Sequence, residues 1–143
     1  MKGKFYRTAI RPAMLYGSEC CPAKVALVRK FEIAEMRMLR WLCGCTMLDR
    51  IQNRLYREKL GVVAMGEKLR EGRLRWFEHV RRRNSTELVK RVEGFQVKGK
   101  RDRGRPRRTW EEQIKLDLQA LHLSEDMIAD RQSWRRSIFI ADV

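Results

Sequence analysis

The sequence predicts an all-α protein of about five helices in a small bundle, with a basic irregular segment between the third and fourth helices. Apolar residues recur at spacings of three and four through most of the 143-residue chain, as on one face of a helix. Proline, glycine and capping residues lie where these periodic stretches begin and end. Hydrophobic residues make up 43% of the chain, so the composition is that of a folded protein.

The strongest periodic stretch covers residues 23–43, with Pro22 before it and Gly44 after it. Spacings of three and four place five apolar side chains on one helical face, which we expect to face the core. These side chains are Leu27, Phe31, Ala34, Met38 and Leu42.

Two further helices are expected in the first half of the chain. Residues 50–60 form the second, with Ile51 and Leu55 facing inward and Gly61 just past its end. Residues 65–83 form the third, and its apolar face includes Trp76.

Residues 84–108 are the least regular part, with a short strand expected over residues 92–97. Thr109 and Glu112 have the spacing of a capping box, which predicts the start of the fourth helix. Ser124 is expected to cap the fifth helix, which carries Trp134. These boundaries predict a helical domain over residues 1–83, a basic linker over 84–108 and a C-terminal helical pair over 109–143.

Positive charge is concentrated in the middle of the chain. The whole chain carries 33 Lys and Arg against 18 Asp and Glu, a formal net charge of +15. Residues 68–108 hold 16 of these bases and 5 of the acids, whereas residues 109–143 hold 4 and 7. A polyanion is the natural partner of such a surface, and nucleic acid is the first candidate. An anionic membrane surface is the main alternative.

The most basic stretch is residues 99–108, where six Lys and Arg occur within ten residues. Its centre, Arg103-Gly104-Arg105-Pro106, matches the core of an AT-hook, in which extended backbone lies in an A·T-rich minor groove and arginines reach its floor. The alternative, which we favour, is a basic tether that contacts only the phosphate backbone. The candidate nucleic-acid-binding residues are Arg81, Arg82, Arg83, Lys98, Lys100, Arg101, Arg103, Arg105, Arg107, Arg108 and Trp110.

Four tryptophans, Trp41, Trp76, Trp110 and Trp134, lie on predicted helices, where helical spacing favours a place in the core. Trp110 directly follows the basic stretch and is the one most suited to stacking on a base.

Cys20, Cys43, Cys45 and His79 could bind zinc, but they lack the short paired spacings of zinc sites. Buried thiols without metal are therefore expected, and no cofactor.

Four ordered blocks of the sequence resemble one known family. They are residues 4–20 (KFYRTAIRPAMLYGSEC), 34–44 (AEMRMLRWLCG), 74–80 (LRWFEHV) and 104–110 (GRPRRTW). They resemble the region after the catalytic core in reverse transcriptases of plant LINE-type (non-LTR) retrotransposons. The resemblance implies a thumb and C-terminal tail that grip template and primer by their backbones. The chain departs from the family pattern at Cys21, Cys45 and Glu78.

The resemblance does not bring the family's activity with it. Polymerases hold two metal ions with paired carboxylates, which the family supplies in a Tyr-x-Asp-Asp turn. This sequence has no such motif, so we expect no enzymatic activity.

The expected function is non-catalytic binding of RNA or DNA by a retrotransposon remnant in the nucleus or cytoplasm. The alternative is a recruited factor that binds another protein or a membrane surface. Residues 1–18 are basic and contain no acids. This composition resembles a mitochondrial presequence and makes mitochondria the alternative location. No apolar run reaches about 20 residues, so no transmembrane helix is expected.

Overall fold

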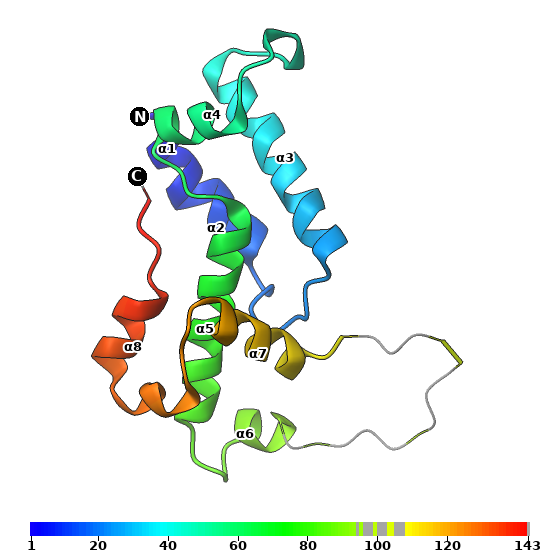
Figure 1. Cartoon of the computed structure of the whole chain (residues 1–143), viewed down its shortest axis with the longest axis vertical. Coiled ribbons are helices and arrows are strands. Elements are labelled where there is room, and N and C mark those ends of the chain that lie inside the picture. Colours follow the sequence, from blue (N-terminus) through cyan, green and yellow to red (C-terminus); the bar gives the residue numbers. More distant parts are fainter. Residues whose placement is uncertain (94, 96–98, 100–102, 105–107, 143) are drawn as a thin grey trace.

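A computed structural model describes residues 1–93, 95, 99, 103–104 and 108–142, and all regular elements in these residues are helical (Figure 1). The all-α class is thereby confirmed. The elements are α1 (Lys2–Phe5), the π-helical η1 (Tyr6–Ile10), α2 (Arg11–Leu15), α3 (Val25–Cys43), the 3-10 turn η2 (Met47–Asp49), α4 (Asn53–Leu60), α5 (Met65–Arg81), α6 (Leu88–Glu93), α7 (Trp110–Ala120), the 3-10 helix η3 (Glu125–Ala129) and α8 (Arg131–Ile138).

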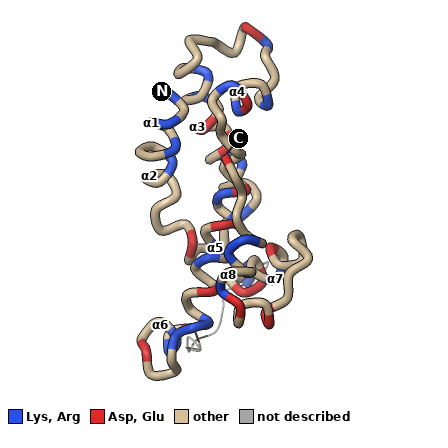
Figure 2. Tube along the Cα trace, turned by 90° about the vertical axis from the view of Figure 1, so that its left-hand side faces the viewer, with Lys and Arg blue, Asp and Glu red and all other residues tan. Residues whose placement is uncertain are grey.

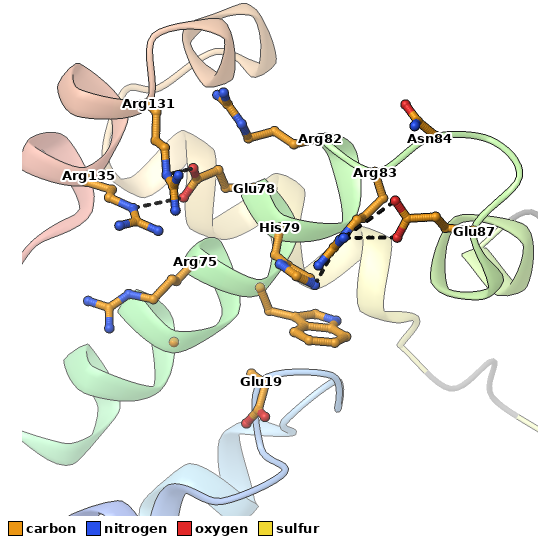
Figure 3. A pocket seen from close by; sticks show the side chains of 12 residues that line it. Glu19, Arg75, Glu78, His79, Arg82, Arg83, Asn84, Glu87, Arg131 and Arg135 are labelled. Carbon is orange, nitrogen blue, oxygen red and sulfur yellow. Dashed lines mark hydrogen bonds and ion pairs between the residues drawn. The ribbon is translucent and has the colours of Figure 1, made fainter.

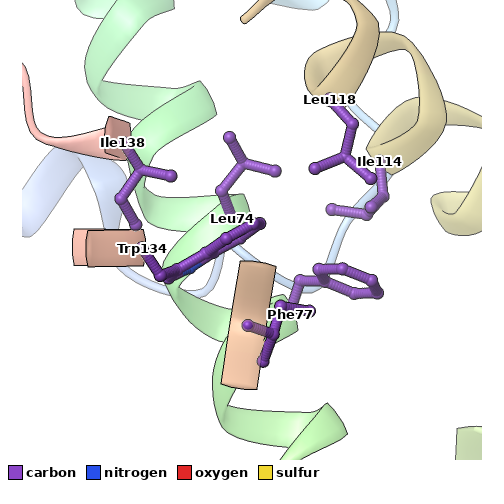
Figure 4. Packing of buried hydrophobic residues seen from close by; sticks show 7 residues of the cluster. Leu74, Phe77, Ile114, Leu118, Trp134 and Ile138 are labelled. Atoms are coloured by element: carbon purple, nitrogen blue, oxygen red, sulfur yellow. The ribbon is translucent and has the colours of Figure 1, made fainter. Parts of the chain in front are cut away.

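Helix α5 connects the two halves of the molecule. In Figure 1 it runs through the middle, with α3, α4 and the N-terminal helix toward one end and α7 and α8 toward the other. Its second half contributes Leu74 and Phe77 to a core that it shares with the C-terminal helices (Figure 4). The other members of this C-terminal core are Ile114, Leu118, Ile128, Trp134 and Ile138. The C-terminal helical pair therefore packs directly on α5.

A second core lies under the N-terminal helix, which α1, η1 and α2 form without interruption. Its members are Tyr6, Met36, Leu39, Leu42, Tyr56 and Val62. Lys2 also donates a hydrogen bond to the carbonyl of Leu42 at 2.8 Å. The basic N-terminus is thus helical and packed into the fold. The sequence pattern predicted neither this helix nor α6.

The expected inner face of α3 is confirmed only in part: Leu42 is buried, and Phe31, Ala34 and Met38 are half-buried. Leu27 is 45% exposed, whereas Glu35, Met36 and Leu39 are buried. The cause is Glu35, whose carboxylate accepts hydrogen bonds from the Tyr6 hydroxyl at 3.0 Å, from Arg57 at 3.1 Å and from the backbone N–H of Met65 at 3.3 Å. Because these partners satisfy a buried acid, the helix turns a charged residue inward, which an apolar pattern cannot anticipate.

Several predicted helix ends are confirmed. Gly44 and Gly61 take positive φ angles of 70° and 60° after α3 and α4, a conformation that glycine adopts without a steric penalty. Thr109 and Glu112 form the expected capping box at the start of α7.

Two other expected helices start differently. The second begins at Asn53 rather than residue 50, after the turn η2, and Ile51 and Leu55 are exposed. The fifth is divided into η3 and α8, because the Asp130 side chain accepts hydrogen bonds from the N–H groups of Gln132 and Ser133 and so caps a new helix.

Part of the expected irregular segment is helical. Val92 and Glu93 end α6, so the strand expected over residues 92–97 is wrong at its start. Of the remaining four positions, only Phe95 lies within the described residues.

Candidate nucleic-acid interface

A groove of about 630 Å³ lies between α5, α8 and the segment that follows α5 (Figure 3). Five arginines line it, together with Trp76, His79 and three glutamates. The arginines are Arg75, Arg82, Arg83, Arg131 and Arg135. Figure 2 shows basic positions at both ends of the molecule, including the end that holds α5, α6 and α8.

Helical spacing brings these basic side chains together. Arg75, His79 and Arg83 follow one another at intervals of four along α5 and the residues just after it, so they share one face. Arg131 and Arg135 are also four residues apart, on α8. Arg75, Arg131 and Arg135 are not among the candidates predicted from the sequence. Arg75 stands alone rather than in a basic run, and residues 109–143 carry more acids than bases overall. Their spacing of four was the signal that could have found them.

The arginines of α8 share a single carboxylate. Nε of Arg131 and Nε of Arg135 lie 3.5 Å and 3.4 Å from Glu78, whose side chain is only 3% exposed. The two arginine side chains are 58% and 51% exposed. One buried negative charge therefore faces two half-exposed guanidinium groups, and the remaining N–H donors are open toward the groove. Planar guanidinium donors of this kind match the oxygen geometry of a phosphate.

Arg75, which also lines the groove, has a similar arrangement. Its Nη2 lies 2.6 Å from Glu71, and Lys68 binds the other oxygen of the same carboxylate at 2.9 Å. Arg75 remains 57% exposed, whereas Lys68 is 14% exposed. Here too one buried carboxylate, that of Glu71, holds two basic side chains in place, so one positive charge is left over.

The predicted triplet Arg81–Arg83 is divided between two roles. Arg81 lies over the Phe77 ring at 5.1 Å and pairs with Glu93 at 3.5 Å, so it joins α5 to α6. Arg82 and Arg83 line the groove, where Arg82 donates to the carbonyl of Ile128 at 2.9 Å and Arg83 pairs with Glu87 at 3.1 Å.

Five candidate residues of the predicted basic linker lie outside the described residues. They are Lys98, Lys100, Arg101, Arg105 and Arg107, and half of the AT-hook core lies outside as well.

Arg103 and Arg108, the candidate binding arginines of the linker that the structure describes, are exposed. Arg103 precedes Gly104, and Arg108 donates to the side-chain carbonyl of Gln113 on α7 at 3.2 Å.

Trp110 is half-buried and held by protein contacts. Its ring centre is 6.0 Å from that of Phe77, and its indole N–H donates to the carbonyl of Glu19 at 2.9 Å. Through these contacts the Trp110 side chain holds the segment around Glu19 against the start of α7. Trp134 is fully buried, as expected, but Trp41 is 79% exposed, so its expected place in the core is wrong.

The cysteines differ from the expected buried thiols. Cys20 and Cys21 are exposed, and Cys43 and Cys45 are half-buried. Partial burial, together with the neighbouring Cys21 thiol and the Glu19 carboxylate, raises the pKa of Cys20. Within the described part of the chain, no three His, Cys, Asp or Glu side chains are grouped as metal ligands would be.

Comparison of the chain with protein-family models, with curated proteins and with solved structures finds no match. None of the helices in the described residues has the length and apolarity needed to cross a bilayer. Function is therefore inferred from the geometry and charge of the groove.

Proposed function

We propose that this chain is a non-catalytic nucleic-acid-binding protein that grips the backbone of RNA or DNA. The observation that carries the proposal is the groove between α5 and α8, where Glu78 holds two half-exposed arginines and three more arginines line the walls. The resemblance of four sequence blocks to LINE-type reverse transcriptases supports the same function, and we propose descent from the thumb and tail of such an enzyme.

Binding rests on phosphate contacts from the groove and from the linker. Arginine donates two parallel hydrogen bonds to a phosphate, and the fixed guanidinium groups of the groove need little reordering to do so. The linker carries further positive charge between α6 and α7 in the sequence. Such contacts position a strand without selecting a sequence.

Salt titration tests the proposal. If the basic surface neutralises about six phosphates, log K falls with log salt at a slope of about −5 on duplex DNA. Arg75→Gln with Arg83→Gln makes that slope shallower by about 2. Lys115→Gln with Arg136→Gln is the matched control, because both residues are exposed, carry the same charge and lie outside the groove.

A salt response that is flat for DNA and RNA alike contradicts backbone binding. Equal losses from the two double variants contradict the assignment to the groove.

The same proposal includes the lack of catalysis and a nuclear or cytoplasmic location. The purified chain extends no primer with Mg²⁺ or Mn²⁺, because the sequence lacks the paired-carboxylate turn that would hold the two ions. Template-dependent synthesis above that of a mock preparation overturns this part. Imaging of the tagged full-length chain tests the location against mitochondria.

A second candidate function is docking on an anionic membrane surface. It is supported by Trp41, Met47 and Leu48, which are 79%, 73% and 89% exposed around the turn η2. Exposed Arg37 and Arg50 flank these apolar side chains. Tryptophan with adjacent arginine is typical of residues that enter the headgroup region of a bilayer.

Vesicle flotation separates the two functions. Membrane docking predicts binding to phosphatidylglycerol vesicles that Trp41→Ala with Leu48→Ala reduces at least tenfold. Nucleic-acid binding alone predicts that this variant keeps its full affinity for DNA and that wild type does not float.

A further inference from the structure

We propose that the groove between α5 and α8 takes single-stranded nucleic acid, with one unpaired base stacked on the Trp76–His79 pair. This inference rests on the proposed function and names its substrate class. Every base has an aromatic face, so such a contact adds affinity for a strand without adding sequence preference.

The two rings form a ready stacking surface. Trp76 and His79 are three residues apart on α5, with ring centres 5.2 Å apart and planes inclined by 25°. Trp76 is half-buried, whereas His79 is exposed and lines the groove. The indole therefore supports the inner side of the imidazole, and the imidazole extends the stack toward solvent.

A neighbouring arginine fixes the imidazole. Nε of Arg83 donates to Nε2 of His79 at 3.4 Å, and Arg83 is held in turn by Glu87 at 3.1 Å (Figure 3). In Figure 3 the imidazole lies beside Arg83, on the side of the groove opposite the Glu78 pair. An aromatic ring that is already oriented loses little conformational freedom when a base stacks on it.

Positive groups lie on both sides of the stacking surface. Arg75 and Arg83 are each four residues from His79, which is about 6 Å along a helix axis. A strand that stacks one base on His79 can therefore place the phosphates on either side of that base near a guanidinium group. This combination of an aromatic platform and flanking cations is how proteins bind single strands without sequence preference.

Duplex nucleic acid can offer phosphates to the arginines of the groove, but it cannot stack a base on Trp76 and His79 unless the duplex opens. Inside a duplex both faces of each base are covered by its neighbours, and exposing one requires unstacking that costs a few kcal/mol. A free nucleotide offers the same base and phosphate but only one phosphate position. The preferred ligand is therefore a strand with unpaired bases.

The test compares a 15-mer of thymidine with an abasic 15-mer that has the same number of phosphates, at one fixed salt concentration. Fluorescence anisotropy should show about tenfold tighter binding of the thymidine strand, which is the gain expected from one stacked base. His79→Ala should abolish this preference and leave the affinity for the abasic strand within about twofold. His122→Asn is the matched control, because His122 is exposed at the end of α7 and does not line the groove.

Two outcomes overturn the inference while leaving backbone binding in place: equal affinity of wild type for both strands, or a preference that survives His79→Ala. Displacement of the bound strand by thymidine monophosphate at equal phosphate concentration overturns it in favour of a nucleotide site. Failure to bind either strand overturns the proposed function itself.

Discussion

At the scale of single residues, several charged side chains are structural. Asp142 accepts hydrogen bonds from Arg11 at 2.7 Å and from the backbone N–H of Val63 at 3.0 Å, which fastens the C-terminal segment to the chain before α5. Arg11 itself is 4% exposed. A count of charges along the sequence treats these residues as surface groups, and it therefore overstates how many bases are free to meet a polyanion.

The contacts of Asp142 predict how stability depends on pH. Burial alone would raise the pKa of Asp142, but the hydrogen bonds from Arg11 and Val63 outweigh it and hold the pKa below the usual value for aspartate. The stability that this lowered pKa contributes is therefore present above about pH 3.9, the pKa in the unfolded chain, and is lost as pH falls through the folded pKa. We expect Asp142→Asn to lower the free energy of unfolding by about 1–2 kcal/mol at pH 7.

Urea unfolding of both proteins from pH 7 to pH 2 measures this. The difference in the free energy of unfolding between wild type and Asp142→Asn should disappear at the acid end of this range. A difference that stays constant over the whole range would show that the carboxylate charge plays no part.

At the scale of elements, α5 is held to its neighbours by charged as well as apolar contacts. Arg73 and Asp117 form a bidentate ion pair between α5 and α7, with distances of 2.7 Å and 3.1 Å, and both side chains are nearly buried. The side chain of Gln113 donates a further hydrogen bond to Asp117 at 3.1 Å. The pair fixes the angle at which the C-terminal helices pack on α5, and so it helps to place α8 beside the groove.

Breaking this pair should be costly, whereas replacing it should not. Arg73→Met leaves a buried carboxylate unpaired, and we expect a loss of about 3–5 kcal/mol in the free energy of unfolding. Arg73→Met with Asp117→Leu removes both charges and should recover most of that loss. Denaturant unfolding of the two variants measures the difference. Additive losses in the double variant would contradict coupling between the residues.

These elements also show how far sequence reasoning reaches. The helical period and the caps at Gly44, Gly61 and Thr109 predicted where most helices lie, because both are local properties of the chain. Trp41 is exposed near the end of α3, against expectation. The inner face of α3 was predicted only in part, because it depends on Glu35 finding partners from three distant segments. Local patterns carry no information about such contacts.

At the scale of the whole molecule, the candidate interface combines two kinds of basic surface. The linker and the Arg81–Arg83 triplet were evident in the sequence as runs of charge. The rest of the groove was not, since Arg75, Arg131 and Arg135 lie at separate positions on α5 and α8. Counting charge by segment made the C-terminal region look acidic. Its acids and bases serve different surfaces, and only the folded chain brings Arg131 and Arg135 to the same groove as Arg75 and Arg83 (Figure 3).

The linker and the groove should differ in what they recognise. If the segment around Arg103 and Arg105 acts as an AT-hook, Arg103→Ala with Arg105→Ala abolishes a preference for A·T-rich duplex, since arginines in the minor groove sense its width and potential. Arg75→Gln with Arg83→Gln should instead weaken binding to all duplexes alike, because phosphate contacts carry no base information. This pair is a cleaner control than Arg81 and Arg82, whose contacts with Phe77 and Ile128 also support the fold.

The basic tether, which we favour, gives a different result in the same experiment. Wild type then shows no preference between A·T-rich and G·C-rich duplexes at one fixed salt concentration, and the two double variants lose similar affinity. Each removes two positive charges, so each should make the salt slope shallower by about 2. Competition between the two duplexes decides the matter: an A·T preference that disappears only in the Arg103 and Arg105 variant contradicts the tether. The hook requires a duplex and the stacking surface at His79 an unpaired strand. An A·T preference, if found together with a preference for the thymidine strand that depends on His79, would therefore mean that linker and groove recognise different forms of nucleic acid.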